Sequence, residues 1–115
     1  MLSKEDILAA QDIRTQVVNV PEWGGDVTIA EMSGTARDTY ERLLFTKVGD
    51  SADIRDLRAK LVAFSIVDEE GNLMFTAGEV AELGKKSARA LTHVFEAASE
   101  LNAIGVEGLD EAAGN

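Results

Sequence analysis

Two β-branched segments flank a proline–glycine turn near the start of the chain, and this arrangement constrains the fold more than any other feature. Residues 15–20 and 27–32 are rich in Val, Ile and Thr and partly alternate between apolar and polar positions, as β-strands do. Pro21 removes a backbone donor, and the Gly24-Gly25 pair permits positive φ angles, so the chain can reverse between the two segments. Neither face of the second segment is cleanly polar. We therefore predict a β-hairpin over residues 15–32 that is covered on at least one face.

The flanking segments show helical spacing instead. Ser3 and Asp6 can form a capping box for a short helix over residues 3–12. Ser33 can cap a second helix over about residues 35–48. The apolar positions of this second segment follow the helical repeat, with charged residues between them.

The C-terminal part carries clear boundary signals. Thr76 and Glu79 have the spacing of a capping box, and Phe75 can act as its hydrophobic staple. Ser87 can cap the last helix, which we expect over about residues 88–103. A single apolar stripe predicts the core-facing side of this helix; it consists of Leu91, Val94, Phe95, Ala98 and Leu101.

The segment from residue 53 to residue 67 fits two structures. Ile54, Leu57 and Leu61 lie on one helical stripe, and charged residues fall between them, which favours a helix through about residue 65. Residues 61–67 also form a short apolar run that would suit a buried strand. The sequence leaves helix and strand open for these seven positions. Residues 68–72 contain three acidic residues, Gly and Asn, and predict a turn.

Together these elements predict an α+β fold in which an N-terminal β-hairpin packs against a mainly helical remainder of three to four helices. The length of 115 residues is typical of one domain. We place that domain at residues 1–104. Residues 105–115 have no apolar stripe and hold three acidic residues and three glycines, so we expect a flexible acidic C-terminal tail there.

Composition argues against several partner classes. The formal net charge is −10, from 11 basic and 21 acidic residues, and such a chain repels phosphate backbones and anionic membranes. There is no Cys for disulfides or thiolate metal sites. No apolar run approaches the roughly 20 residues that span a bilayer. We expect no nucleic-acid or membrane partner and a cytoplasmic location.

Motifs for catalysis or cofactor binding are missing from the sequence. His93 is the single His, at the edge of the stripe on the last helix, where a surface position is expected. No nucleophile elbow or phosphate-binding loop occurs. A calcium loop with Gly71 at its sixth position would need carboxylates where Ile66 and Ala77 stand. We therefore expect neither catalytic residues, nor a cofactor, nor a metal, and hence no enzyme.

Trp23, at the tip of the expected hairpin, admits two interpretations. The indole either folds back over the core or serves as an exposed aromatic anchor, the residue type enriched at interface hot spots. Gly24 and Gly25 offer no side chains to cover it. We take Pro21, Trp23 and Met32 as candidate partner-binding residues.

Several short motifs follow one another in a fixed order along residues 2–103. They are Leu2-Ser3-Lys4-Glu5-Asp6-Ile7-Leu8, Val20-Pro21-Glu22-Trp23-Gly24-Gly25, Glu31-Met32-Ser33-Gly34, Leu61-Val62-Ala63-Phe64-Ser65-Ile66-Val67-Asp68-Glu69-Glu70-Gly71-Asn72, Leu73-Met74-Phe75-Thr76, and Glu82-Leu83-Gly84-Lys85-Lys86-Ser87. In this order they resemble the small tail assembly chaperones encoded by siphophages and prophages.

The resemblance implies a function that composition does not show. Such chaperones are α+β proteins that bind the tape-measure protein, keep it soluble and help recruit the tail-tube protein during tail tube assembly. We accordingly expect a homo-oligomer in the host cytoplasm that is absent from the mature virion. Many members also occur as a longer, frameshifted form, which an amino-acid sequence does not reveal. The alternatives are another phage structural or head–tail joining protein, and a small antitoxin-like regulator.

Overall fold

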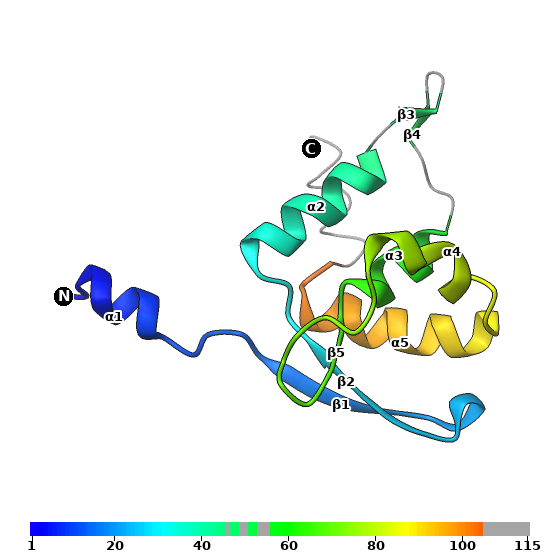
Figure 1. The fold of residues 1–115 in the computed structure, drawn as a ribbon, viewed down its shortest axis with the longest axis horizontal. Helices are drawn as coiled ribbons and strands as arrows, with labels where there is room; N and C mark the ends of the chain where they lie inside the picture. The colour runs from blue at the N-terminus through cyan, green and yellow to red at the C-terminus, as the bar shows by residue number, and fades with distance from the viewer. Residues whose placement is uncertain (46, 49–50, 53–55, 105–115) are drawn as a thin grey trace.

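The computed structural model contains a three-stranded antiparallel sheet in the order β1-β2-β5, whose β1-β2 hairpin lies along the lower side of the molecule in Figure 1. The structure describes residues 1–45, 47–48, 51–52 and 56–104. Strands β1 (Thr15–Val20) and β2 (Gly25–Ala30) pair along their whole length, which confirms the predicted hairpin. Strand β5 (Ile66–Val67) pairs with the other edge of β2 and places Ile66 opposite Ile29.

The hairpin turn is tighter than the sequence suggested. A 3₁₀ turn, η1 (Pro21–Trp23), follows β1 directly, and Gly24 adopts a left-handed conformation with φ of 78°. Because Gly24 alone completes the reversal, Gly25 already pairs with Val20, two residues before the expected start of the second strand. That strand also ends at Ala30, not at residue 32.

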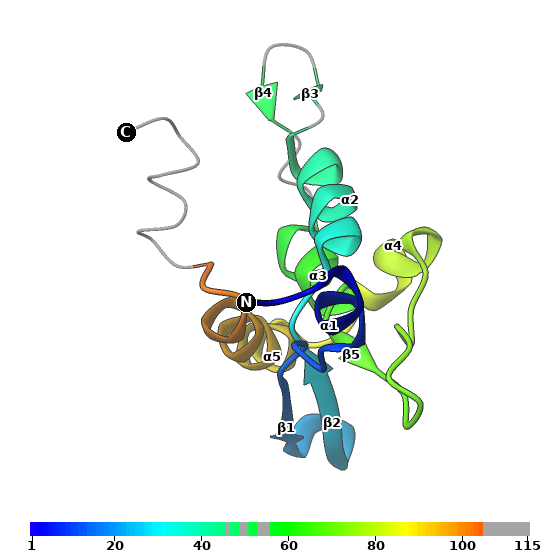
Figure 2. The ribbon, with the colours of Figure 1, turned by 90° about the vertical axis from the view of Figure 1, so that its left-hand side faces the viewer.

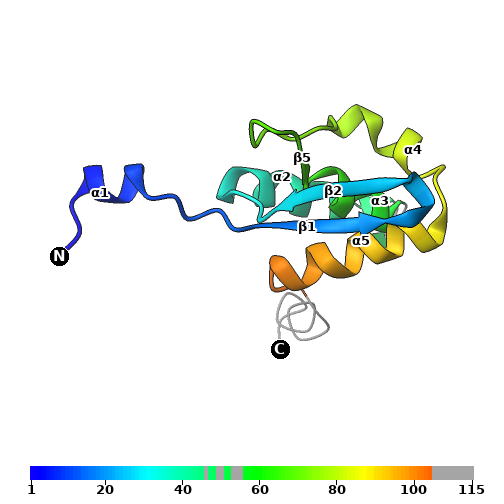
Figure 3. The same ribbon diagram turned by 90° about the horizontal axis from the view of Figure 1, so that it is seen from below.

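The two faces of the hairpin are covered unequally: Val18 and Val20 share one face and are buried, whereas Val17 on the other face is 63% exposed. The neighbouring residues Ile29 and Ala30 point to opposite faces of β2, and both are buried. Helix α5 (Ala88–Leu101) contacts β1, β2 and η1 and runs beside the hairpin (Figures 2 and 3). The hairpin therefore belongs to the core instead of forming a separate surface ribbon.

The remaining described elements are mainly helical. They are α1 (Lys4–Ala9), α2 (Gly34–Phe45), β3 (Lys47–Val48), β4 (Ser51–Ala52), α3 (Leu57–Ala63), η2 (Ala77–Glu79) and α4 (Val80–Leu83). Helix α3 contacts α2, α4 and α5. The predicted α+β class, with a hairpin packed against helices, is confirmed. The predicted C-terminal tail at residues 105–115 lies outside the described residues.

The second predicted helix is shorter than expected. It ends at Phe45, and residues 47–48, which we had assigned to it, form the short strand β3. Val48 is β-branched and pairs there with Ser51. The predicted helix over 35–48 is therefore wrong in its last turn.

Residues 61–67 contain both of the structures that the sequence left open. Helix α3 ends at Ala63, and the hydroxyl of Ser65 donates a hydrogen bond to the carbonyl of Leu61 at 2.7 Å. The carbonyl of Ser65 then accepts from the N–H of Ala30 at 2.8 Å, which starts the pairing of β5 with β2. The predicted helix through residue 65 is thus two residues too long.

The last helix matches its prediction closely. The hydroxyl of Ser87 accepts from the N–H of Ala90 at 3.3 Å and caps α5. Within the predicted stripe, Leu91, Val94 and Ala98 are buried. The other two members, Phe95 and Leu101, are half-buried and pack against the core. The stripe is therefore a core face.

Helix α1 stands apart from the rest of the molecule (Figures 1 and 3). Its capping box forms as predicted: Ser3 and Asp6 exchange hydrogen bonds between side chain and backbone at 3.0 and 3.1 Å. None of its residues is buried, and Leu8 is 78% exposed. Tertiary packing supplies most of the stability of short helices, and α1 buries no residue against the described part of the chain.

Candidate partner-binding site

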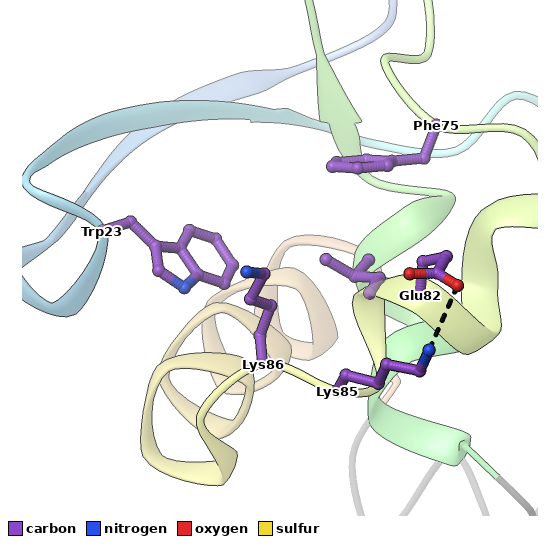
Figure 4. Close-up of a pocket in the computed structure, with 6 residues that line it drawn as sticks. Trp23, Phe75, Glu82, Lys85 and Lys86 are labelled. Carbon is purple, nitrogen blue, oxygen red and sulfur yellow. Dashed lines mark hydrogen bonds and ion pairs between the residues drawn. The ribbon is translucent and has the colours of Figure 1, made fainter.

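An open recess of about 500 Å³ lies between the hairpin tip and the connection from α4 to α5 (Figure 4). Three of its lining residues are apolar and three are charged. They are Trp23, Phe75, Leu83, Glu82, Lys85 and Lys86. Segments far apart in the sequence therefore build one surface that combines aromatic area with charge.

Trp23 forms the hairpin side of the recess. It ends η1, and its side chain is half-buried and packs against the core. A Cβ at Gly24 or Gly25 would meet no atom within 4 Å, so the glycines leave this side of the hairpin open. Trp23 is thus partly packed against the core and partly exposed: one part of the indole is covered, and the other faces the recess.

The apolar counterpart of Trp23 comes from the segment around α4. Phe75 is half-buried and Leu83 is 5% exposed. The carboxylate of Glu79 accepts a hydrogen bond from the N–H of Thr76 at 2.9 Å, the contact predicted from their spacing. This bond fixes the backbone directly after Phe75 and so positions its ring. In Figure 4 the Phe75 ring lies across the recess from Trp23.

The charged side of the recess comes from the α4–α5 connection. Lys85 Nζ lies 3.2 Å from Glu82 Oε1, and both side chains are more than two-thirds exposed, so the pair adds little stability. Lys86 points toward the indole of Trp23 in Figure 4. Its ammonium makes no ion pair within the described part of the chain.

Gly84, between Leu83 and Lys85, has a steric role in this connection. A Cβ at this position would lie 2.6 Å from Oδ1 of Asp56. The absent side chain therefore leaves room for the Asp56 carboxylate at the start of α3. Gly84 ends α4, with an ordinary right-handed φ of −63°.

The structure brings together only two of the three predicted site residues. Pro21 is exposed and shares η1 with Trp23. Met32 follows the opposite end of β2, is 8% exposed and belongs to the core. Met32 thus offers no surface in this fold, and we leave it out of the candidate site. The sequence did not indicate Phe75 and Lys86 as binding residues, although it indicated Phe75 as the hydrophobic staple of a capping box.

Residue types that commonly act in catalysis or metal binding lie apart from one another in the described structure. No set of three or more His, Asp or Glu residues that could hold a metal ion occurs in the described ranges. His93 is exposed, as expected, with Nε2 3.0 Å from the carbonyl oxygen of Asn19. Burial raises the pKa of Tyr40, whose ring packs edge-on against Phe64 in the core. Among the helices that the structure describes, none is long and apolar enough to cross a membrane.

These features define a small α+β domain whose candidate site is a recess for another molecule. Residues 4–115 match the family described as phage tail assembly chaperone, and the chain belongs to that family. The predicted resemblance is thereby confirmed. A search of curated proteins found no match.

A solved structure shows the same fold. The tail assembly chaperone of bacteriophage HK97 superposes with a TM-score of 0.60 over 84% of this chain and 94% of its own. The two sequences are 21% identical. Fold similarity therefore extends over most of both chains, although the sequences have diverged.

Proposed function

We propose that this protein binds the tape-measure protein of its phage, keeps it soluble and promotes assembly of the tail tube. The match of residues 4–115 to the tail assembly chaperone family carries this proposal. A role in recruiting the tail-tube protein follows from the same family membership. The proposed role needs binding and release, and no catalytic group takes part in it.

The recess at Trp23 is the surface that we assign to the tape-measure protein. It offers two half-buried aromatic rings, Trp23 and Phe75, over a floor that contains Leu83. Such partly covered aromatic side chains gain further burial when a partner docks, and Trp is enriched at interface hot spots. An apolar partner segment that would otherwise aggregate can bury its surface there.

The net charge supports the solubilising part of the proposal. A chain with a formal charge of −10 repels its own copies at long range. A complex that carries several such chains would stay dispersed even when the partner is strongly apolar. We place this activity in the host cytoplasm and expect the protein to be absent from the finished virion.

Helix α1 supports the proposal that the protein acts as an oligomer. Its apolar side chains are exposed, with Leu2 at 73%, Ile7 at 59% and Leu8 at 78%. A helix of six residues that buries nothing against the residues described by the structure is marginal in water. Docking on another copy would bury these side chains and stabilise the helix.

Co-expression with the tape-measure protein of the same phage tests the proposal. We expect the tape-measure protein to move from the insoluble to the soluble fraction and to co-purify with this chain. A tape-measure protein that stays insoluble, or that is soluble but never co-purifies, would contradict the proposal.

Mass spectrometry of purified virions tests the transient role. A chaperone should be absent or present only in traces. A fixed number of copies per particle would support the alternative, a structural or head–tail joining protein.

A further inference from the structure

We infer that the recess selects a partner segment in which an apolar anchor side chain is accompanied by a carboxylate. This inference rests on the proposed function, because it specifies the chemistry of the partner segment at the same recess. It follows from the charge that the recess carries and from where that charge lies.

The recess differs in sign from the whole molecule. Its lining contains two lysines and one glutamate, a formal charge of +2 − 1 = +1, whereas the chain carries −10. Glu22 adjoins Trp23 in sequence but is not among the lining residues. The net charge of the chain repels an acidic partner, whereas the two lysines that line the recess attract a carboxylate there.

The two lysines are not equivalent. Lys85 already shares its charge with Glu82 at 3.2 Å, whereas Lys86 makes no ion pair with any described residue. In Figure 4 the side chain of Lys86 extends toward the indole of Trp23. A cation held at the rim of an apolar recess is the charge that a docking carboxylate would meet.

Docking would strengthen this attraction. An apolar anchor placed between Trp23 and Phe75 displaces water from the recess, and a lower local dielectric increases the interaction between opposite charges. A bonded carboxylate–ammonium pair is also stronger than a neutral hydrogen bond. On a helical partner, residues three or four positions apart share a face, so one turn presents both the anchor and the carboxylate.

A partner segment with a basic residue next to its apolar anchor is attracted by the whole molecule but repelled at the recess. The overall charge attracts it toward the protein, but Lys86 opposes its cation at the recess. Like charges that face each other across an interface disfavour the wrong partner. The recess therefore discriminates by the charge next to the anchor as well as by its apolar character.

Trp23 is the only Trp of the chain, so its fluorescence reports directly on this site. The probes are three synthetic helical peptides of equal length. The first carries Leu with Glu four positions later, the second Leu with Lys at that later position, and the third Ala with Glu. We expect the first to shift the Trp23 emission saturably and to bind about tenfold or more tightly than either of the others.

A charge-reversal variant of the recess provides a second test. Lys86→Glu should invert the preference, so that the Lys-bearing peptide binds better than the Glu-bearing one. Lys4→Glu is the matched control: it changes the net charge equally on α1, and the preference should stay as in the wild type. Equal binding of all three peptides, binding of none, or a preference unchanged by Lys86→Glu would overturn the inference.

Two further readouts separate this inference from the proposed function. If the tape-measure protein co-purifies but the peptides show no charge preference, only the inference fails. If the tape-measure protein never binds, the proposed function itself fails. A Trp23 emission that changes on dilution without any peptide would show that a second copy occupies the recess, and would overturn the partner segment as its occupant.

Discussion

The side chain of Asn102 holds the backbone of Met32 across 70 positions of the sequence. Asn102 Oδ1 accepts a hydrogen bond from the Met32 N–H at 2.8 Å, and Nδ2 donates to the carbonyl of Ala98 at 2.9 Å. The Asn102 side chain is buried, with 7% of the residue exposed. The end of α5 is thereby joined to the segment that connects β2 to α2.

Removal of this link should destabilise the fold. Asn102→Ala leaves the buried N–H of Met32 without its partner, and an unsatisfied buried donor costs about 1–3 kcal/mol. Urea denaturation should show this loss as a lower midpoint with an unchanged slope. Glu100→Ala, an exposed change on the same helix, is the control and should have little effect. A stability equal to wild type for Asn102→Ala would show that water replaces the bond.

The stripe on α5 predicts a graded response to truncation. Leu91 is buried, so Leu91→Ala should cost about 2–5 kcal/mol. Phe95 is only half-buried, so Phe95→Ala should cost less than the roughly 3–5 kcal/mol of a fully buried Phe. Thermal and urea unfolding of both variants measure which substitution lowers the free energy of unfolding more. A larger loss for Phe95→Ala than for Leu91→Ala would contradict the packing described here.

An exposed ion pair at the open end of the hairpin predicts a shifted titration. Hydrogen bonds from the side chain and backbone of Arg14 lower the pKa of Glu31 below its usual value near 4.5. Because the folded pKa is the lower one, the stabilising effect is present above the usual carboxylate pKa and is lost as the pH falls through the folded value. NMR titration of Arg14→Ala should show the Glu31 pKa rising toward its usual value. An unchanged pKa would mean that the guanidinium does not act on this carboxylate.

Local signals along the sequence predicted the ends of several elements. Ser3, Thr76 and Ser87 each mark a helix start, because a cap depends on residues only three positions away. The Pro21–Gly25 turn was likewise visible, since proline and glycine restrict or free the backbone where they stand. The α5 stripe was read from spacing within one helix.

Features that depend on distant pairing were predicted incompletely. A strand was one of two alternatives for residues 61–67, and Ile66 and Val67 form β5 because they pair with β2; two residues are too few to show a periodic pattern. Met32 was taken as a candidate partner-binding residue, but the structure buries it, and its N–H is bonded to Asn102, which lies 70 positions away. Trp23 was recognised, but its neighbours Phe75 and Lys86 come from other elements that only the tertiary fold brings to the recess.

The affinity of the Trp23→Ala variant for the tape-measure protein tests the central claim most directly. Phe45→Ala is the control, because it removes an aromatic ring that does not line the recess and is 50% exposed at the end of α2. We expect Trp23→Ala to weaken the association measured by titration calorimetry by about 2 kcal/mol or more, with a smaller loss of folding stability than Leu91→Ala, and Phe45→Ala to bind as the wild type does. Wild-type affinity for Trp23→Ala, with the variant folded, would contradict the assignment of the recess as the partner-binding site.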